Sequence, residues 1–280
     1  MCGLSMRSAR LKPDSGTYYH VMNRIAGTKS SYPFGHEEKQ MFITIMNKYL
    51  KLYKIELLSH CIMSNHYHLV LFSPGKISNE EIKIRWQDFY GHSKGHFHPE
   101  PLWESSETIE QWRQRLSDVS DFMKVLQQSF TAWYNRTHNR RGYFWADRFK
   151  SVILEGGNSL IRCIKYVELN PLRANILDEN NNYIYSSYGI YMTSKKHPLE
   201  VNLLKHLPTA LGSKSKETIR CFYQTIETII CDASTKEFST RQSIWTHSKI
   251  IGSKNFITKL IKKYCQLSPD IKSTSDICFI

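Results

Sequence analysis

The chain has 280 residues, of which 41% are hydrophobic and 12% aromatic, so it is long enough to bury a full core. Its 38 Lys and Arg residues outnumber 25 Asp and Glu residues, and the net charge of +13 favours polyanionic partners, although lysine-rich solubility is the plainer alternative. The seven scattered cysteines suggest neither a disulfide framework nor a zinc ribbon, and no stretch approaches the roughly 18 apolar residues of a membrane span, so we expect a cytoplasmic protein without a membrane partner.

The first half of the chain alternates strand and helix patterns. Residues 17–24 are rich in aromatic and branched side chains after a turn cluster, which predicts a strand. Apolar side chains recur every three or four residues over 36–53, which indicates an amphipathic helix. Residues 54–63 return to strand composition and connect tightly to a further strand at 66–72, so we expect a hairpin. Strand, helix and hairpin form the first half of a ferredoxin-like split unit.

The second half of this unit follows after an irregular stretch. The longest helical pattern covers residues 108–136, a short apolar strand covers 151–154, and a second helix covers 159–170, where Pro171 interrupts it. The fold predicted by this order is α+β: a ferredoxin-like, four-stranded antiparallel sheet with helices on one face, plus one additional helix.

The composition changes after about residue 192, which predicts a domain over 1–192 and an appendage over 193–280. The appendage has no strong strand pattern and two modest amphipathic stretches, near 215–231 and 253–266, so we expect it to be small and helical. Its lysines are typical of a solvated helix face, with an auxiliary DNA-binding surface as the alternative.

Two histidines lie at the start of the predicted strand over 66–72. Successive side chains of a strand point to opposite faces, so His66 and His68 share one face and Tyr67 lies on the other. Two imidazoles on one face can hold a metal ion; the alternative is a pair of hydrogen-bonded, half-buried histidines.

Tyr166 and Asn170 are four residues apart in the predicted helix and therefore share a face. The amide oxygen of Asn170 is a hard donor that could complete a site with two imidazoles. A tyrosine beside a metal could attack phosphorus and form a covalent phosphotyrosine, which conserves the bond energy and requires no nucleotide cofactor. The alternative is that Tyr166 is a core aromatic residue and Asn170 a turn residue before Pro171. The combination of Tyr166 and Asn170 with a His-x-His strand in a basic chain favours the functional interpretation.

Three ordered segments resemble the HUH-type single-strand endonucleases, in particular the REP-associated tyrosine transposases. They are residues 19–24 (YHVMNR) with 63–70 (MSNHYHLV), the aromatic and basic stretch over 133–151, and residues 166–171 (YVELNP). The resemblance covers roughly residues 10–190 and leaves the appendage outside it.

This resemblance implies a metal-dependent endonuclease and strand transferase, a transposase, that acts on single-stranded or hairpin DNA. It implies that Tyr166 is the nucleophile, which takes the 5′ phosphate and releases a 3′ hydroxyl. It also implies that His66, His68 and Asn170 hold a divalent metal, Mg²⁺ or Mn²⁺. A catalytically silent DNA-binding protein derived from such an enzyme is the main alternative. A histidine-triad nucleotide hydrolase would require a third histidine at Val70.

Basic side chains near these segments are expected to contact DNA phosphates, while exposed aromatic side chains stack on unpaired bases. The candidates are Arg24, Arg136, Arg140, Arg141, Arg148 and Lys150. A homodimer is compatible with the sequence.

Overall fold

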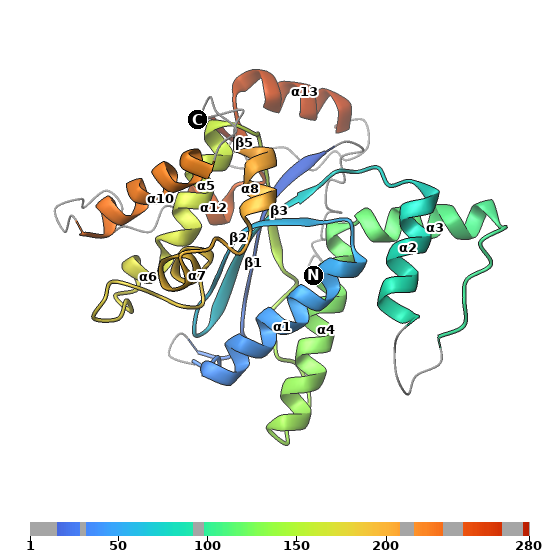
Figure 1. Ribbon diagram of the computed structural model, residues 1–280, viewed down its shortest axis with the longest axis horizontal. Coiled ribbons are helices and arrows are strands. Elements are labelled where there is room, and N and C mark those ends of the chain that lie inside the picture. Colours follow the sequence, from blue (N-terminus) through green and yellow to red (C-terminus); the bar gives the residue numbers. More distant parts are fainter. Residues whose placement is uncertain are drawn as a thin grey trace, which may run out of the picture.

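A computed structural model describes residues 16–28, 32–91, 98–207, 216–231, 243–264 and 277–279. The protein is an α+β structure, and in these residues six strands form one sheet in the order β2-β3-β1-β4-β5-β6 (Figure 1). The strands are β1 (Thr17–Arg24), β2 (Glu56–Ile62), β3 (His66–Ser73), β4 (Lys150–Leu154), β5 (Ile250–Gly252) and β6 (Ile277–Phe279).

The sheet is mixed, so the expected four-stranded antiparallel sheet was wrong in extent. Strands β2, β3, β1 and β4 are antiparallel neighbours, whereas β5 pairs parallel to β4 and β6 parallel to β5. Both added strands come from the region expected to be only helical. Each has three residues, too few for a recognisable alternation of polar and apolar side chains, and parallel pairing depends on distant parts of the chain.

Helices cover both faces of the sheet (Figure 1). On one face, α1 (His36–Leu52) and α4 (Val119–Thr137) pack over Tyr67: the ring centroids of Phe42 and Tyr67 are 4.9 Å apart, and the Gln127 amide donates to the Tyr67 hydroxyl at 2.8 Å. On the other face lies α5 (Asn158–Glu168), which contacts β2 and β3. The remaining helices described below or drawn in Figure 1 are α2 (Asn79–Tyr90), α3 (Ser106–Ser117), α6 (Asn170–Arg173), α7 (Ser187–Ser194), α8 (Glu200–His206), α10 (Lys216–Cys231), α12 (Ile244–His247) and α13 (Lys254–Tyr264).

The helix predicted over 108–136 is two helices, α3 and α4. They separate at Asp118, whose backbone is extended (φ −88°, ψ 109°) and whose carboxylate accepts a hydrogen bond from the Ser120 amide at 2.7 Å. An aspartate that caps a helix N-terminus satisfies an otherwise unpaired N–H and starts a new helix there. The apolar spacing continues across this break, which is why periodicity alone did not reveal it.

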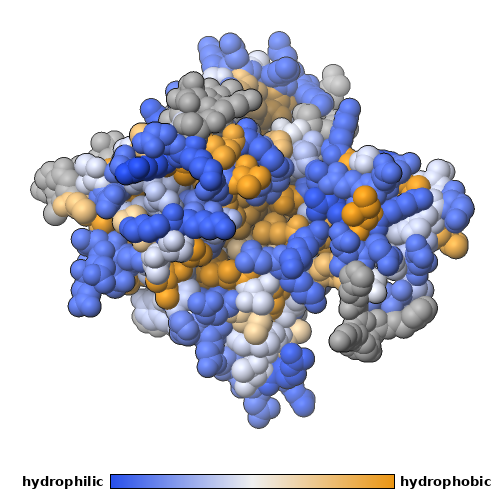
Figure 2. Space-filling view, in the orientation of Figure 1, coloured by the Kyte–Doolittle hydropathy of each residue, from blue (hydrophilic) through white to orange (hydrophobic). Residues whose placement is uncertain are grey.

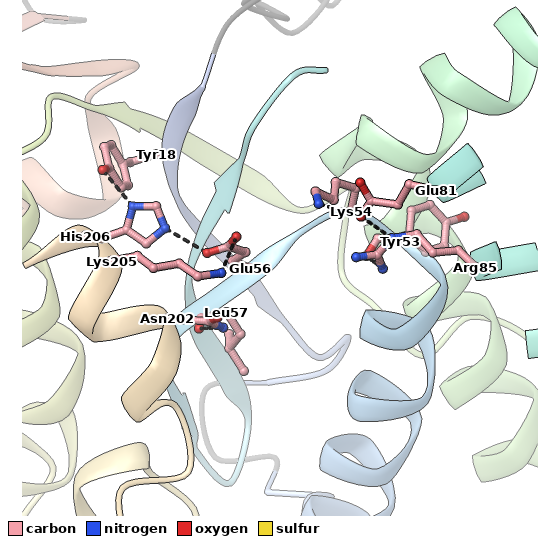
Figure 3. A network of polar contacts seen from close by, with 10 residues as sticks. All are labelled: Tyr18, Tyr53, Lys54, Glu56, Leu57, Glu81, Arg85, Asn202, Lys205 and His206. Carbon is pink, nitrogen blue, oxygen red and sulfur yellow. Dashed lines mark hydrogen bonds and ion pairs between the residues drawn. The ribbon is translucent and has the colours of Figure 1, made fainter. Parts of the chain in front are cut away.

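The region after residue 192 is tied to the sheet by a polar network at the end of α8 (Figure 3). His206 bridges two strands, because its Nδ1 lies 3.0 Å from the Tyr18 hydroxyl of β1 and its Nε2 lies 2.8 Å from Glu56 Oε2 of β2. Asn202 Nδ2 donates to the Leu57 carbonyl at 3.0 Å. The His206 hydrogen bond is the main cause of a lowered Glu56 pKa. This region therefore packs on the same sheet as the rest of the chain, and its division into a domain of its own stays a prediction.

The surface seen in Figure 2 is mainly hydrophilic, with apolar side chains gathered towards the middle of that face. Among the described residues, no helix is both long and apolar enough to cross a membrane. Residues 1–15 lie outside the described part of the chain.

Candidate functional site

A cavity of about 690 Å³ opens where the N-terminal half of β3 meets α5, α6 and α12. It brings together seven of the residues predicted from the sequence: Arg24, His66, His68, Arg148, Lys150, Tyr166 and Asn170. The other residues that line it are Met22, Asn23, Met63, Asn65, Ala146, Asp147, Arg173, Ala174, Thr246 and His247. Several basic side chains and a single acid, Asp147, line this cavity, so it favours an anionic ligand.

Strand β3 places its two histidines on the face opposite Tyr67. His66 is half-buried and His68 is buried, and their ring centroids are 5.1 Å apart. The antiparallel register sets Arg24 of β1 directly opposite His66, and Arg24 lines the same cavity.

Tyr166 of α5 lies against His68 and lines the same cavity. Its ring centroid is 5.7 Å from that of His68 and 5.8 Å from that of Trp245, with which it stacks. The guanidinium carbon of Arg173 lies 4.4 Å from the centre of the Tyr166 ring, and burial lowers the pKa of Arg173. Tyr166 is only 5% exposed, so it is enclosed on several sides while still reaching the cavity.

Asn170 closes the C-terminal end of α5, which ends at Glu168, two residues earlier than the sequence pattern predicted. Its amide nitrogen donates to the carbonyl oxygens of Tyr166 (3.1 Å) and Val167 (3.2 Å). These carbonyls lose their helical partners because the chain turns at Leu169 into α6, where Pro171 is an early residue. With the nitrogen used in this way, the amide oxygen is the atom of Asn170 suited to a cation.

His20, a buried residue of β1 that contacts His68, is not among the site residues predicted from the sequence. His20 Nδ1 lies 2.9 Å from the Trp245 carbonyl oxygen, and His20 Nε2 lies 2.9 Å from His68 Nδ1. Burial lowers the pKa of His20 to about 4, so it is neutral near pH 7. His20 pairs with Val70 in the sheet, so the β1–β3 register would have placed it on the face of His68.

The cavity contains donor atoms of the kinds that bind divalent cations. His66 Nδ1 lies 2.6 Å from Asn65 Oδ1, and His68 Nδ1 lies 2.9 Å from His20, so in both rings Nε2 is the nitrogen suited to a metal. Within the described ranges, no group of three or more His, Cys, Asp and Glu side chains is placed to hold a metal. A cation here would therefore need the Asn170 oxygen, water or a phosphate oxygen beside the two imidazoles.

Three of the predicted DNA contacts, Arg136, Arg140 and Arg141, do not line the cavity. They are exposed at the C-terminal end of α4 and in the loop that follows. Arg140 donates to the Tyr143 carbonyl at 3.4 Å, and the Tyr143 side chain is 90% exposed. This loop forms a second basic surface with one exposed aromatic ring, separate from the cavity lining.

No protein-family model matches the chain, and no curated protein matches it either. Among solved structures, it is similar to a REP-associated tyrosine transposase bound to a REP hairpin, with 12% sequence identity and a TM-score of 0.44. The alignment covers 69% of this chain and 90% of the other. A similarity this distant assigns no activity, so the function is argued from the residues of the cavity.

Proposed function

We propose that this protein is a metal-dependent single-strand DNA endonuclease and strand transferase with Tyr166 as its nucleophile. The observation that carries the proposal is that Tyr166, Asn170, His66 and His68, from β3 and from the α5–α6 segment, line one basic cavity, with the Tyr166 and His68 ring centroids 5.7 Å apart. The motif resemblance of these segments to HUH endonucleases supports the same assignment.

The chemistry follows from the residues in the cavity. Arg24, Arg148 and Lys150 would hold the phosphates of a single strand or hairpin. The Tyr166 oxygen would attack phosphorus and lose its proton, while the bond from phosphorus to the 3′ oxygen breaks and that oxygen takes up a proton. A divalent cation held by His66, His68 and Asn170 would neutralise charge on the reacting phosphate. The attached 5′ phosphate could then be passed to another 3′ hydroxyl.

One observation favours the second candidate, a catalytically silent DNA-binding protein. Tyr166 is 5% exposed, its ring is stacked on Trp245 and the Arg173 guanidinium lies over it, so little of its side chain is open to an incoming phosphate. The two candidates share DNA binding and differ in covalent chemistry.

The deciding experiment is incubation of the protein with Mn²⁺ and single-stranded or hairpin oligonucleotides labelled at the 3′ end, the part of the strand that stays attached to Tyr166, followed by denaturing electrophoresis. An endonuclease gives a labelled covalent adduct that Tyr166→Phe abolishes. The matched control is Tyr143→Phe, because Tyr143 is exposed and outside the cavity. Binding without any adduct, over a panel of repeat and hairpin sequences, would support the silent protein.

A second prediction separates the metal site from DNA binding. His66→Ala should reduce cleavage by at least about 10²-fold, because an intact metal site supplies several kcal/mol of transition-state stabilisation. DNA affinity should change by less than about threefold, since phosphate contacts provide most of it. Both are measured on the same oligonucleotide, by adduct formation and by fluorescence anisotropy. An equal loss of affinity and cleavage would contradict separate roles for His66 and the basic side chains.

A further inference from the structure

The region after residue 192 reaches the proposed metal site through a chain of two hydrogen bonds. The Trp245 carbonyl of α12 contacts His20 Nδ1, and His20 Nε2 contacts His68 Nδ1, both at 2.9 Å. His20 and His68 are 0% and 4% exposed, so water does not compete for these contacts. Trp245 also stacks on Tyr166, and Thr246 and His247 line the cavity.

The chemistry of the three groups fixes the direction of both bonds. A carbonyl oxygen only accepts, so His20 Nδ1 carries the hydrogen. The interactions of His20 in the described part of the chain are with this carbonyl and with the rings of His68 and Tyr166, so no carboxylate holds a second proton on it. A neutral His20 therefore offers a lone pair at Nε2. That lone pair accepts from His68 Nδ1, which must be the protonated nitrogen of His68.

We propose that His20 is a positioning residue, which holds His68 in its Nδ1-protonated form and thereby directs the Nε2 lone pair of His68 to a divalent cation. This inference rests on the proposed function, since it concerns the same cavity. Partners of this kind orient metal-binding imidazoles and raise their basicity, and their loss typically costs 10-fold to 100-fold in metal affinity.

The role of α12 follows from the same contacts. In solution, a histidine at the surface exchanges between its two neutral forms, whereas His68 is held in one form by His20, which in turn is fixed by the Trp245 carbonyl from the C-terminal region. The last part of the chain thus contributes to the site a hydrogen-bond acceptor and a ring stacked on Tyr166, and it has a function besides covering the sheet.

The test uses the full-length protein without metal, with ¹⁵N-labelled histidine. Long-range ¹H–¹⁵N spectra report which ring nitrogen of His68 is protonated, and we expect Nδ1. His20→Phe keeps a buried ring and removes the acceptor, so the His68 signal should shift towards the Nε2-protonated form and Mn²⁺ affinity, measured by electron paramagnetic resonance, should fall about 10-fold to 100-fold. His20→Gln restores an acceptor oxygen and should recover part of that affinity.

His60→Phe is the control, because His60 is a buried histidine of β2 that contacts Ser187 and lies outside the cavity. A wild-type His68 protonated at Nε2 would overturn the inference, even if every variant failed to fold. Equal loss of Mn²⁺ affinity in His20→Phe and His60→Phe would also overturn it, by reducing His20 to a core residue. If the tautomer and Mn²⁺ results hold but no DNA adduct forms, the inference stands and the proposed strand cleavage fails.

Discussion

At the scale of single residues, His197 shows how burial makes the stability of this protein depend on pH. It lies outside the cavity, its Nδ1 accepts from the Leu199 amide at 3.0 Å, and its Nε2 lies 2.7 Å from the Tyr223 hydroxyl. Burial, with a smaller effect of nearby His60, lowers the pKa of His197 to about 3. The unfolded chain protonates this histidine near pH 6.5, so its contribution is complete above that pH and is lost as pH falls towards 3.

We therefore predict that His197→Gln flattens the acid side of the stability profile. Between pH 7 and pH 5 the wild-type protein should lose about 2 kcal/mol more free energy of unfolding than the variant, because His197 contributes a slope near 1.4 kcal/mol per pH unit in most of this window. Urea unfolding of both proteins at a series of pH values measures the difference. If the free energies of unfolding of the two proteins changed in parallel with pH, the pKa of His197 would be the same in the folded and the unfolded protein.

At the scale of elements, the outer edge of β2 is already occupied. The Ile62 amide donates to the Tyr185 carbonyl at 3.0 Å, and the His60 amide donates to Ser187 Oγ at 2.8 Å. The Leu57 carbonyl accepts from Asn202. An edge strand with satisfied backbone groups does not template pairing with another chain. A homodimer of this protein would need a surface other than the β2 edge, and its existence stays a prediction.

The same edge gives a stability prediction. Ser187→Ala removes the partner of the buried His60 amide and Nδ1, and an unsatisfied buried polar group costs about 1–3 kcal/mol. The matched control is Ser194→Ala at the exposed end of α7, which should change the free energy of unfolding by less than about 0.5 kcal/mol. Urea titrations of the three proteins provide the comparison. Equal stability of both variants would mean that water replaces the Ser187 hydroxyl.

Elements with local signals could be predicted from the sequence, and those that depend on distant contacts could not. The strand at 17–24 and the helix starting at His36 have the predicted positions, because alternation and helical spacing are local properties. The break at Asp118 was hidden because apolar spacing continues across it. Strand β5 exists only where the chain returns to pair with β4.

The candidate site divides in the same way. Residues within short motifs, such as His66 and His68 or Tyr166 and Asn170, could be selected from the sequence, and their roles stay predictions. His20 could not be selected from a short motif, because its importance depends on a contact with Trp245, which is 225 positions away along the chain. Arg136, Arg140 and Arg141 were predicted to contact DNA together with Arg148, which is near them in sequence, but of these four arginines only Arg148 lines the cavity.

At the scale of the whole molecule, the net charge of +13 can act at a distance or through particular contacts. A general field attracts a polyanion without selecting a site. Contacts with individual phosphates release bound counterions, so each contact adds to the steepness with which affinity falls as salt rises. These two origins predict different effects of removing charges at different places on the surface.

We predict that single-stranded DNA binding weakens steeply with salt and that the cavity accounts for part of this slope. The double variant Arg148→Ala with Lys150→Ala should reduce the slope of log affinity against log salt by about 1 to 1.5, at roughly 0.7 for each phosphate that is no longer neutralised. The control is Lys259→Ala with Lys262→Ala, which removes two exposed charges of α13 outside the cavity and should leave the slope unchanged. Fluorescence anisotropy between 50 and 300 mM salt, about a sixfold range, resolves such a change. If both double variants reduced the slope equally, DNA binding would depend on the overall field of the protein. If the affinity of the wild type did not change with salt, its basic charge would play no part in DNA binding.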